Sequence, residues 1–336
     1  MVYRLIALLA LILVACGGTA TPSAVPAASV GRPEKDRVKL VYATASGQDT
    51  FVELAAQKSM FQTYGLTGEV GYAQSNTSIA ALTSGEAQLA MSDAVSAASA
   101  IAAGTPLKVI AYFDKYSPYM VVALPENKTF ADLKGKTVAI SRVGDTSDIS
   151  LRIAFRDSGL MPGKDFTLLQ VGNSPARWAA LSSKQVAAAI LDEEAFRGPA
   201  EKEGMNVLIN LHEKKLPYAA SALIVTEAYG KDNPNTVVAV LRTLMDATAY
   251  MADPKNKDEV MALMSKLLRI PAGDPQLGRT YGAYHARPAP DPYPDRAGVE
   301  TILAAYKDID PQRYGSMTPE QVIDSRYMDT IRALKN

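Results

Sequence analysis

Short apolar runs alternate with longer helical stretches along most of the chain, and this alternation constrains the fold more than any other feature. Four strands are expected in the first part, at residues 38–43, 67–72, 87–91 and 107–113. Helices are expected between them, at residues 50–61, up to 82 and 94–103. Strands separated by helices of this length favour a largely parallel sheet. Such sheets bind ligands at the loops that follow the carboxyl ends of the strands, so we expect binding residues there.

A second group of strands and helices follows the first. Its expected strands are residues 137–141, 166–171, 187–191 and 206–211, and its expected helices are 146–158, up to 182, and 193–203. The apolar run Ser221–Thr226 is interpreted as a strand that returns to the first group. The rest is expected to be helical, at residues 235–252, 256–269, 296–308 and 319–334, with a proline-rich break at 286–294.

A weak internal repeat links the two groups. Residues 81–93 read ALTSGEAQLAMSD, and residues 180–192 read ALSSKQVAAAILD, at a constant offset of 99. Each copy holds a helix end, a tight turn, a short strand and an aspartate at the strand's carboxyl end. Alanine and serine are common enough to match by chance, but the matching element order favours two similar lobes that face each other across a cleft. We place lobe one at residues 38–122 plus 219–336 and lobe two at residues 123–218.

The segment 133–148, LKGKTVAISRVGDTSD, predicts a turn, a buried strand, a polar loop and the start of a helix. Gly144 allows close approach of the backbone. Two interpretations stay open. The loop either binds a small molecule beside a helix N-terminus, or it is an ordinary connection in which Asp145 caps the helix and Asp148 helps to close a capping box.

Charge and residue usage exclude several classes of function. Lysine plus arginine equals aspartate plus glutamate at 35 each, so no overall field attracts nucleic acid. The single cysteine, Cys16, rules out an internal disulfide and a cysteine metal cluster. A metal site or a histidine-based triad would have to use His212 or His285, and we predict neither a metal nor a cofactor.

The first residues have the pattern of a targeting segment. Arg4 precedes an apolar run at 5–14, which is too short to span a bilayer permanently. The run ends in LVAC at 13–16, which resembles a bacterial lipobox; an ordinary signal peptide with an incidental cysteine is the alternative. We predict a signal peptide at 1–15, lipidation of Cys16 and a flexible tether at 16–37, rich in Ala, Thr, Ser, Pro and Gly.

Seven segments together carry a family resemblance that covers nearly all of the chain after residue 38. They are ALTSGEAQ (81–88), GTPLKVIA (104–111), DLKGKTVAISRVGDTSD (132–148), GLMPGKDFTLLQVGNSPARWAALSS (159–183), AEKEGMNVL (200–208), NPNTVVAVLRTLMDATAYMADPKNKDE (233–259) and DPYPDRAGVETIL (291–303). In their order and spacing the chain resembles a substrate-binding protein of ABC importers, in the nitrate, sulfonate, taurine and thiamine-precursor class.

The resemblance implies an α/β fold of the type II periplasmic-binding kind, a Venus flytrap in which each lobe is a mainly parallel sheet flanked by helices. It implies a monomeric, extracytoplasmic solute-binding protein, not an enzyme. Such a protein captures a small organic molecule between its lobes and delivers it to an ABC permease with its ATPase. The membrane contact would be the lipid anchor, either in the periplasm or on the outer face of the cell membrane.

The family builds its pocket from the loops after the strands of both lobes, and this places the ligand-binding residues. In lobe one they are Ser46, Gly47, Gln48, Asn76, Thr77, Ser92 and Asp93, with Phe113 as an aromatic wall. In lobe two they are Ser141, Gly144, Asp145, Thr146 and Ser147, with Arg177 as a candidate base. Asp192 and Glu193 face the same opening if the repeat is real.

The acids in these loops depart from what an anion site needs. Asp145 at a helix N-terminus satisfies the free amides and the positive end of the dipole, and Asp93, Asp192 and Glu193 add negative charge. Arg142 and Arg177 are the compensating bases. We therefore predict a neutral or cationic organic ligand, such as a thiamine-precursor-like heterocycle, at least as strongly as nitrate or a sulfonate. The alternative is that these acids only cap helices and face solvent.

Two other functions stay open. Thiamine-pyrimidine synthases are enzymes with the same fold and use a histidine in the cleft, whereas neither His212 nor His285 lies in one of the predicted cleft loops. A ligand sensor that docks to a membrane receptor would have the same sequence features as a transport protein.

Overall fold

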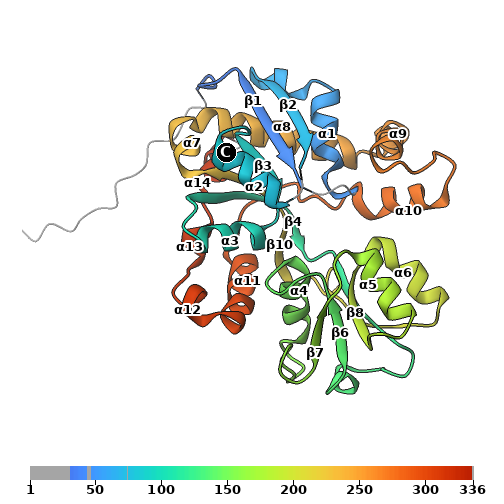
Figure 1. The fold of residues 1–336 in the computed structure, drawn as a ribbon. Helices are drawn as coiled ribbons and strands as arrows, with labels where there is room; N and C mark the ends of the chain where they lie inside the picture. Colours follow the sequence, from blue (N-terminus) through green and yellow to red (C-terminus); the bar gives the residue numbers. More distant parts are fainter. Residues whose placement is uncertain (1–30, 44–46, 74, 335–336) are drawn as a thin grey trace, which may run out of the picture.

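The computed structural model describes residues 31–43, 47–73 and 75–334. The predicted signal peptide, Cys16 and most of the predicted tether lie outside these described residues. The described chain forms two lobes, each built around one five-stranded sheet with helices packed against it (Figure 1). The two-lobed α/β architecture predicted from the sequence is therefore confirmed.

Lobe one is built on a sheet with the strand order β2-β1-β3-β10-β4. Its strands are β1 (Arg37–Tyr42), β2 (Thr67–Tyr72), β3 (Leu89–Ser92), β4 (Leu107–Tyr116) and β10 (Pro217–Thr226). β1 pairs in parallel with β2 and β3, while β10 runs antiparallel to β3 and β4. The carboxyl ends of β1, β2 and β3 therefore point to the same edge of the sheet.

Lobe two repeats this arrangement with the order β7-β6-β8-β5-β9. Its strands are β5 (Tyr119–Ala123), β6 (Thr137–Ile140), β7 (Thr167–Gln170), β8 (Ala188–Asp192) and β9 (Asn206–Asn210). β6 pairs in parallel with β7 and β8, and β5 runs antiparallel to β8 and β9. β3 and β8 occupy equivalent third positions, so the two copies of the sequence repeat fall on equivalent strands.

Helices cover both sheets. Before β5 the chain forms η1 (Gly47–Asp49), α1 (Thr50–Gln57), η2 (Met60–Tyr64), α2 (Ser75–Ser84) and α3 (Ala94–Ala102). Lobe two contains η3 (Phe130–Leu133), α4 (Thr146–Phe155), α5 (Ser174–Ser182) and α6 (Glu193–Lys202). After β10 come α7 (Glu227–Asp232), α8 (Pro234–Ala252), η4 (Pro254–Asn256), α9 (Lys257–Leu268), α10 (Pro275–Tyr284), α11 (Arg296–Ile309), α12 (Pro311–Tyr314), α13 (Pro319–Val322) and α14 (Arg326–Ala333). Within the described chain, no helix combines the length and apolarity that a membrane span requires.

The C-terminal helices differ from the sequence prediction in number. The short helices α7 and α12 and the longer α10 were not predicted, and the helix predicted at 319–334 is split into α13 and α14. The split occurs because Ile323 forms a bridge with Val109 on the edge of β4, and the backbone N–H of Asp324 donates to the Val109 carbonyl at 2.9 Å. β4 is the edge strand of the first sheet, and its free backbone groups can pair with an extended residue but not with a helical one.

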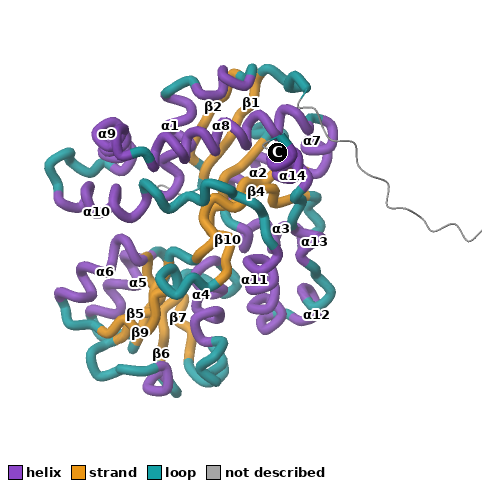
Figure 2. Tube along the Cα trace, turned by 180° about the vertical axis from the view of Figure 1, so that it is seen from behind, coloured by secondary structure: helices purple, strands orange, loops and turns teal. Residues whose placement is uncertain are grey.

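The chain enters lobe two earlier than the boundary predicted between residues 122 and 123. β5 begins at Tyr119 and pairs along its whole length with β8, so residues 119–122 belong to the second sheet. The return is close to the prediction, since β10 begins at Pro217 opposite Tyr116 of β4. β4 and β10 run side by side where the chain passes between the lobes (Figures 1 and 2).

α11 packs against both lobes, although its residues were assigned to lobe one. Val299 and Ile302 of this helix share one buried apolar cluster with Ile149 of α4. Nη2 of Arg156, which follows α4, also donates to the Thr301 carbonyl at 3.1 Å. Figures 1 and 2 show α11 beside both α3 and α4. The helix therefore links the first lobe to the second through apolar and polar contacts.

Part of the predicted tether is docked rather than free. Glu34 accepts hydrogen bonds from the backbone N–H groups of Asn235 and Thr236, at 3.1 and 2.8 Å, in the first turn of α8. The Asn235 amide and the Thr236 hydroxyl donate to the same carboxylate. Residues 31–36 are fixed by these contacts, because a carboxylate satisfies amides that a helix N-terminus leaves open.

Candidate functional site

The loops after the strands of the two lobes meet at Tyr306 of α11. Its hydroxyl lies 3.1 Å from the carbonyl oxygen of Val95 in α3 and 3.0 Å from that of Gly144, before α4. One hydroxyl carries one proton, so it donates to one carbonyl at a time. Val95 lies two residues after Asp93, and Gly144 lies directly before Asp145. The aspartates at the N-termini of α3 and α4 are therefore neighbours across the lobes.

Asp93 caps α3. Its carboxylate accepts from the backbone N–H of Ser96 at 2.8 Å and from the Ser96 hydroxyl at 2.9 Å. The residue is only 8% exposed. Burial raises the pKa of this carboxyl, and the nearby charge of Asp145 adds to the rise although the bonds from Ser96 oppose it. Asp93 is thus a buried carboxylate at the edge of lobe one that faces lobe two.

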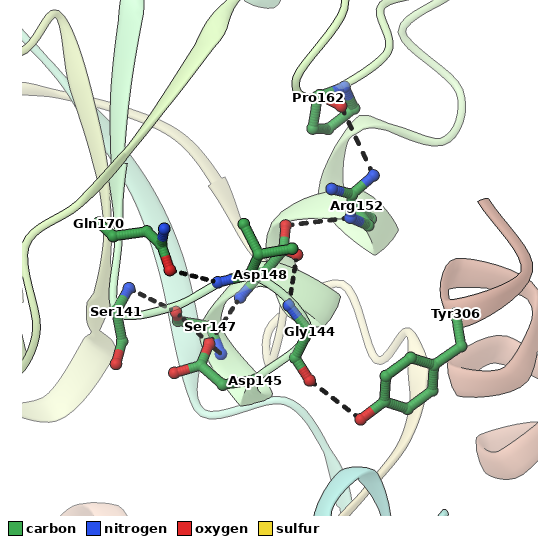
Figure 3. Close-up of polar contacts among 10 residues, drawn as sticks. Ser141, Gly144, Asp145, Ser147, Asp148, Arg152, Pro162, Gln170 and Tyr306 are labelled. Atoms are coloured by element: carbon green, nitrogen blue, oxygen red, sulfur yellow. Dashed lines mark hydrogen bonds and ion pairs between the residues drawn. The ribbon is translucent and has the colours of Figure 1, made fainter. Parts of the chain in front are cut away.

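Hydrogen bonds within the loop from Ser141 to Asp148 hold its shape, and Gln170 and Tyr306 add contacts from outside it, as Figure 3 shows. Asp145 Oδ1 accepts from the backbone N–H groups of Ser147 and Asp148, at 3.0 and 3.2 Å, and from the Ser147 hydroxyl at 2.7 Å. Ser147 Oγ in turn accepts from the Ser141 N–H at 2.8 Å. Gly144 has φ +77°, a conformation that glycine adopts without strain. The helix-capping interpretation of this loop therefore describes its internal contacts.

Asp148 is not part of a capping box, because it accepts from the Gly144 N–H at 2.8 Å instead of the N-cap amide. It is fully buried and pairs with Arg152 Nε at 3.0 Å. Burial raises the pKa of Asp148 even though Arg152 lowers it. The residue holds the glycine turn in place from inside lobe two.

Tyr119 lies where charges from both lobes act together. It is the β-register partner of Asp192, and the guanidinium carbon of Arg177 lies 6.0 Å from its ring centroid. Burial raises the pKa of the Tyr119 hydroxyl, and Asp192 raises it further while Arg177 opposes this. Asp145 and Asp93 also act on the same hydroxyl. We call Asp93, Asp145, Asp192, Tyr119 and Tyr306 the strand-end site.

Arg177 is held by its own lobe. Its Nε donates to the Ile190 carbonyl at 2.6 Å, its Nη1 to the Gly172 carbonyl at 2.5 Å and its Nη2 to Ser174 Oγ at 2.6 Å. Ser174 then donates to Asp192 at 2.5 Å. Arg177 is 2% exposed, so it fastens α5 to β8 and reaches the strand-end site only through Ser174 and the ring of Tyr119.

The first predicted binding loop packs against α10. Gly47 lies against the ring of Tyr284, which leaves no room for a Cβ at this position. Gln48 and Phe113 line one narrow crevice together with Tyr284 and Arg287. Phe113 is fully buried against Phe51, with ring centroids 4.9 Å apart, so it belongs to the core of lobe one.

The other predicted residues occupy different surroundings. Ser92 ends β3 and is 3% exposed, whereas Thr77 in α2 is exposed and Thr146 begins α4 half-buried. Asn76 lies in the first turn of α2, and Ser46 lies outside the described residues. Glu193 pairs with Arg197 one turn along α6, at 3.2 Å.

Sequence reasoning missed the residues that join the lobes. Thr280 of α10 donates a 2.5 Å hydrogen bond to Glu194 of α6. Tyr306 and Thr280 lie in helices far along the chain from the strand-end loops, and no local sequence pattern points to their contacts. The neighbouring pair Glu193 and Glu194 was a usable signal, because it places two carboxylates directly after the strand-end aspartate.

A cavity of about 960 Å³ lies elsewhere, beside the strands that connect the lobes. Its lining includes Lys115, Asp295, Arg296 and Glu320. These charges pair with each other, Lys115 with Asp295 at 3.3 Å and Arg296 with Glu320. None of the predicted binding residues lines this cavity. Among the described residues, no cluster of three or more His, Cys, Asp or Glu side chains is arranged to hold a metal ion.

Solved structures share the two-lobed architecture. The periplasmic nitrate-binding protein NrtA from Synechocystis PCC 6803 aligns with a TM-score of 0.68 and 18% identity, over 91% of this chain and 90% of that chain. The periplasmic aliphatic sulphonate binding protein SsuA from Escherichia coli aligns with a TM-score of 0.68 and 21% identity, over 87% and 92%. The alkanesulfonate-binding protein SsuA from Xanthomonas axonopodis pv. citri, bound to MOPS, gives 0.66 and 18%, over 86% and 98%.

At these identities the alignments establish the periplasmic-binding-protein fold, which confirms the fold and the resemblance predicted from the sequence. No curated protein matches the chain significantly in sequence. The family model described as NMT1/THI5 like matches residues 48–257, more than half of the 336 residues. The chain belongs to the NMT1/THI5-like family.

Proposed function

We propose that this protein is an extracytoplasmic solute-binding protein that captures a small organic molecule between its lobes and delivers it to an ABC import permease. The observation that carries the proposal is the convergence of Asp93 from lobe one with Asp145, Asp192 and Tyr119 from lobe two. A molecule bound there touches both lobes. The aligned structures are named as nitrate-binding and sulfonate-binding proteins, which supports solute binding as the role of this chain.

Binding between two lobes explains how such a protein signals that it is loaded. Contacts made by both lobes at once exist only when the lobes are closed, so the ligand favours the closed state by that difference in affinity. The permease then distinguishes loaded from empty protein by shape. Thr280 with Glu194, and Tyr306 with Gly144, are contacts that such a motion would make and break.

A binding role suits the placement of the two histidines. His285 stacks on Tyr281, with ring centroids 4.5 Å apart, and its Nδ1 lies 2.9 Å from the Tyr281 carbonyl oxygen. His212 lies edge-on to Tyr116, and burial lowers the pKa of its ring. Neither histidine is a member of the strand-end site, where a histidine-dependent enzyme would need one.

Native mass spectrometry of the full chain tests solute binding. We expect protein purified without denaturant to carry a small-molecule adduct that is lost on unfolding and refolding. Refolded protein should then gain thermal stability, saturably, when concentrated spent growth medium is returned, because a ligand that binds only the folded state stabilises it by mass action. Protein that carries no adduct and shows no response to the medium would contradict the proposed function.

The lipid anchor is a separate part of the proposal. We expect Cys16 to carry acyl chains and to hold the protein at the outer face of a membrane through the predicted flexible tether that follows it. Cys16→Ser should move the protein from the membrane fraction to the soluble fraction and remove the mass of the lipid. An unchanged distribution and mass would contradict the anchor while leaving solute binding intact.

A further inference from the structure

We infer that the strand-end site selects a small organic cation, a molecule that carries an ammonium group beside an apolar or aromatic body. The inference rests on the proposed function and names the class of solute that the function would serve. It depends on three features of the site: capped helix N-termini, an excess of carboxylates, and a buried hydroxyl group beside aromatic rings.

Three of the helix N-termini that follow the strands, those of α3, α4 and α5, are already capped by side chains. Asp93 takes the Ser96 N–H of α3, and Asp145 takes the first amides of α4. Asn173 caps α5 in the same way, with Oδ1 accepting from the Ala176 N–H at 3.0 Å. A helix N-terminus attracts anions because its amides are open and its dipole end is positive. In each of these three helices a side chain already accepts from an amide of the first turn, and two of the three caps are themselves negative.

The net charge of the strand-end site is negative. Asp93, Asp145 and Asp192 all act on the Tyr119 hydroxyl, and Arg177 opposes them. The Nε, Nη1 and Nη2 atoms of Arg177 already donate to its own lobe. In the described chain, Asp145 Oδ2 accepts no hydrogen bond. An anion would meet three carboxylates there, whereas an ammonium group would find acceptors.

The charges around the neighbouring crevice do not reverse this sign. Arg287 pairs with Asp114 at 2.6 Å, and both side chains are buried. Glu194, which acts on Tyr284 together with Asp192, adds negative charge from lobe two. With this pair counted as neutral, the crevice adds Glu194 to the three aspartates and adds no unpaired guanidinium group from Arg287.

A buried polar atom beside these acids is without a partner in the described residues. It is Oγ of Ser92, which lies directly before Asp93 and is 3% exposed. A buried hydroxyl without a partner costs stability until a ligand supplies one. Together with the carboxylates and the rings of Tyr119 and Tyr306, this oxygen atom suits a cation that has N–H donors and an apolar body.

The test uses the full chain and three probes that share one ring: benzylamine, benzyl alcohol and benzenesulfonate. We expect benzylamine to raise the melting temperature in a saturable way and the other two probes to leave it unchanged. Asp93→Asn and Asp145→Asn remove one charge each but keep the cap, because asparagine caps helices about as well as aspartate. Each should weaken benzylamine binding about tenfold, the effect of losing one interaction with a charged acceptor.

Asp274→Asn is the matched control. Asp274 is also a helix N-cap, accepting from the Gln276 N–H at 2.8 Å, but it is exposed at the start of α10 and outside the strand-end site. Its substitution should leave benzylamine binding unchanged. Calorimetric titration of the three variants and the parent protein gives the four affinities to compare.

Every other result overturns the inference. Stabilisation by benzenesulfonate alone would show an anion site. Equal stabilisation by all three probes would show that the site does not distinguish ligands by their charge. Stabilisation by none of them would remove the cation site, and so would benzylamine binding that is unchanged in Asp93→Asn and Asp145→Asn. The solute adduct seen by native mass spectrometry is independent of these probes, so the proposed function stands or falls separately.

Discussion

Thr280 donates a 2.5 Å hydrogen bond to Glu194, and this contact joins α10 of lobe one to α6 of lobe two. The acceptor is a carboxylate, so the bond is of the stronger, charge-assisted kind. A hinge motion that separates the lobes at this point has to break it. The contact therefore stabilises the observed arrangement of the lobes relative to one in which α10 and α6 are apart.

Thr280→Val removes the hydroxyl and keeps the shape of the side chain. We expect the balance between closed and open lobes to shift toward open by about 1.5–3 kcal/mol, or roughly 10- to 150-fold, the range for one hydrogen bond to a charged group. Small-angle scattering should show a larger radius of gyration. Thr330→Val is the control, because its hydroxyl bonds within α14 to the Arg326 carbonyl. Equal radii for the two variants would contradict the assignment.

Tyr306→Phe tests the second link between the lobes. The variant keeps the ring, which stacks on Tyr314 with centroids 4.2 Å apart, and loses the hydroxyl that lies between Val95 and Gly144. We expect a loss of about 1–2 kcal/mol in the free energy of unfolding, because a buried carbonyl is left without a donor. Urea denaturation measures it.

The control for this prediction is Tyr64→Phe. Its hydroxyl bonds to Asp246 at 2.6 Å on the exposed surface of lobe one. That substitution should cost less than half as much and should leave hydrogen exchange in α4 unchanged, whereas Tyr306→Phe should speed exchange there. Similar effects of the two substitutions would argue against a link between the lobes.

Arg177→Met should destabilise lobe two strongly. Arg177 is buried and donates three hydrogen bonds, which leaves the carbonyl oxygens of Gly172 and Ile190 unsatisfied when it is replaced. We expect a loss of about 3 kcal/mol or more in the free energy of unfolding. Arg326→Met, which removes an exposed pair with Asp324, should cost less than about 1 kcal/mol. Trp178 fluorescence reports unfolding of lobe two, since its ring packs on Phe196 there.

Asp93 should make stability depend on pH. Burial raises its pKa in the folded protein above the ordinary value of 3.8. The protonated Asp93 therefore contributes fully to stability at pH values below 3.8. This contribution is lost as the pH rises through the folded pKa, because the unfolded chain releases the proton at a lower pH than the folded protein does. At neutral pH the ionised, buried carboxylate costs free energy, about 1.4 kcal/mol for each unit of pKa shift.

Asp93→Asn should accordingly be more stable than the parent protein near pH 7, with an advantage that shrinks as the pH falls toward about 3. Urea denaturation across this range measures the difference, and Asp274→Asn provides the reference. A variant that is less stable than the parent at neutral pH would show that the carboxylate stabilises the empty protein. If Asp93→Asn is more stable than the parent protein and also binds benzylamine more weakly, Asp93 costs stability in the empty protein and serves in binding the ligand.

Much of the fold could be predicted because local sequence patterns determine the strands, turns and helix caps. The strands of both sheets follow from apolar runs between turns, and the repeat ending at Asp93 and Asp192 falls on equivalent strands, β3 and β8. The capping role of Asp145 follows from its place before a helix. Each of these depends on residues within one or two turns of each other, so the order of the amino acids is sufficient to determine them.

Only the tertiary structure decided how the pieces meet. Residues 31–36 were expected to be free, yet Glu34 binds the start of α8 some two hundred residues away. Helix formation stops after Val322 because Ile323 pairs with β4, and Tyr306 reaches Gly144 because α11 packs between the lobes. These contacts join residues far apart in the chain, and their geometry exists only once both sheets have formed. For that reason the sequence determined which loops carry the acids, and the packing of the C-terminal helices determined which of those loops face each other.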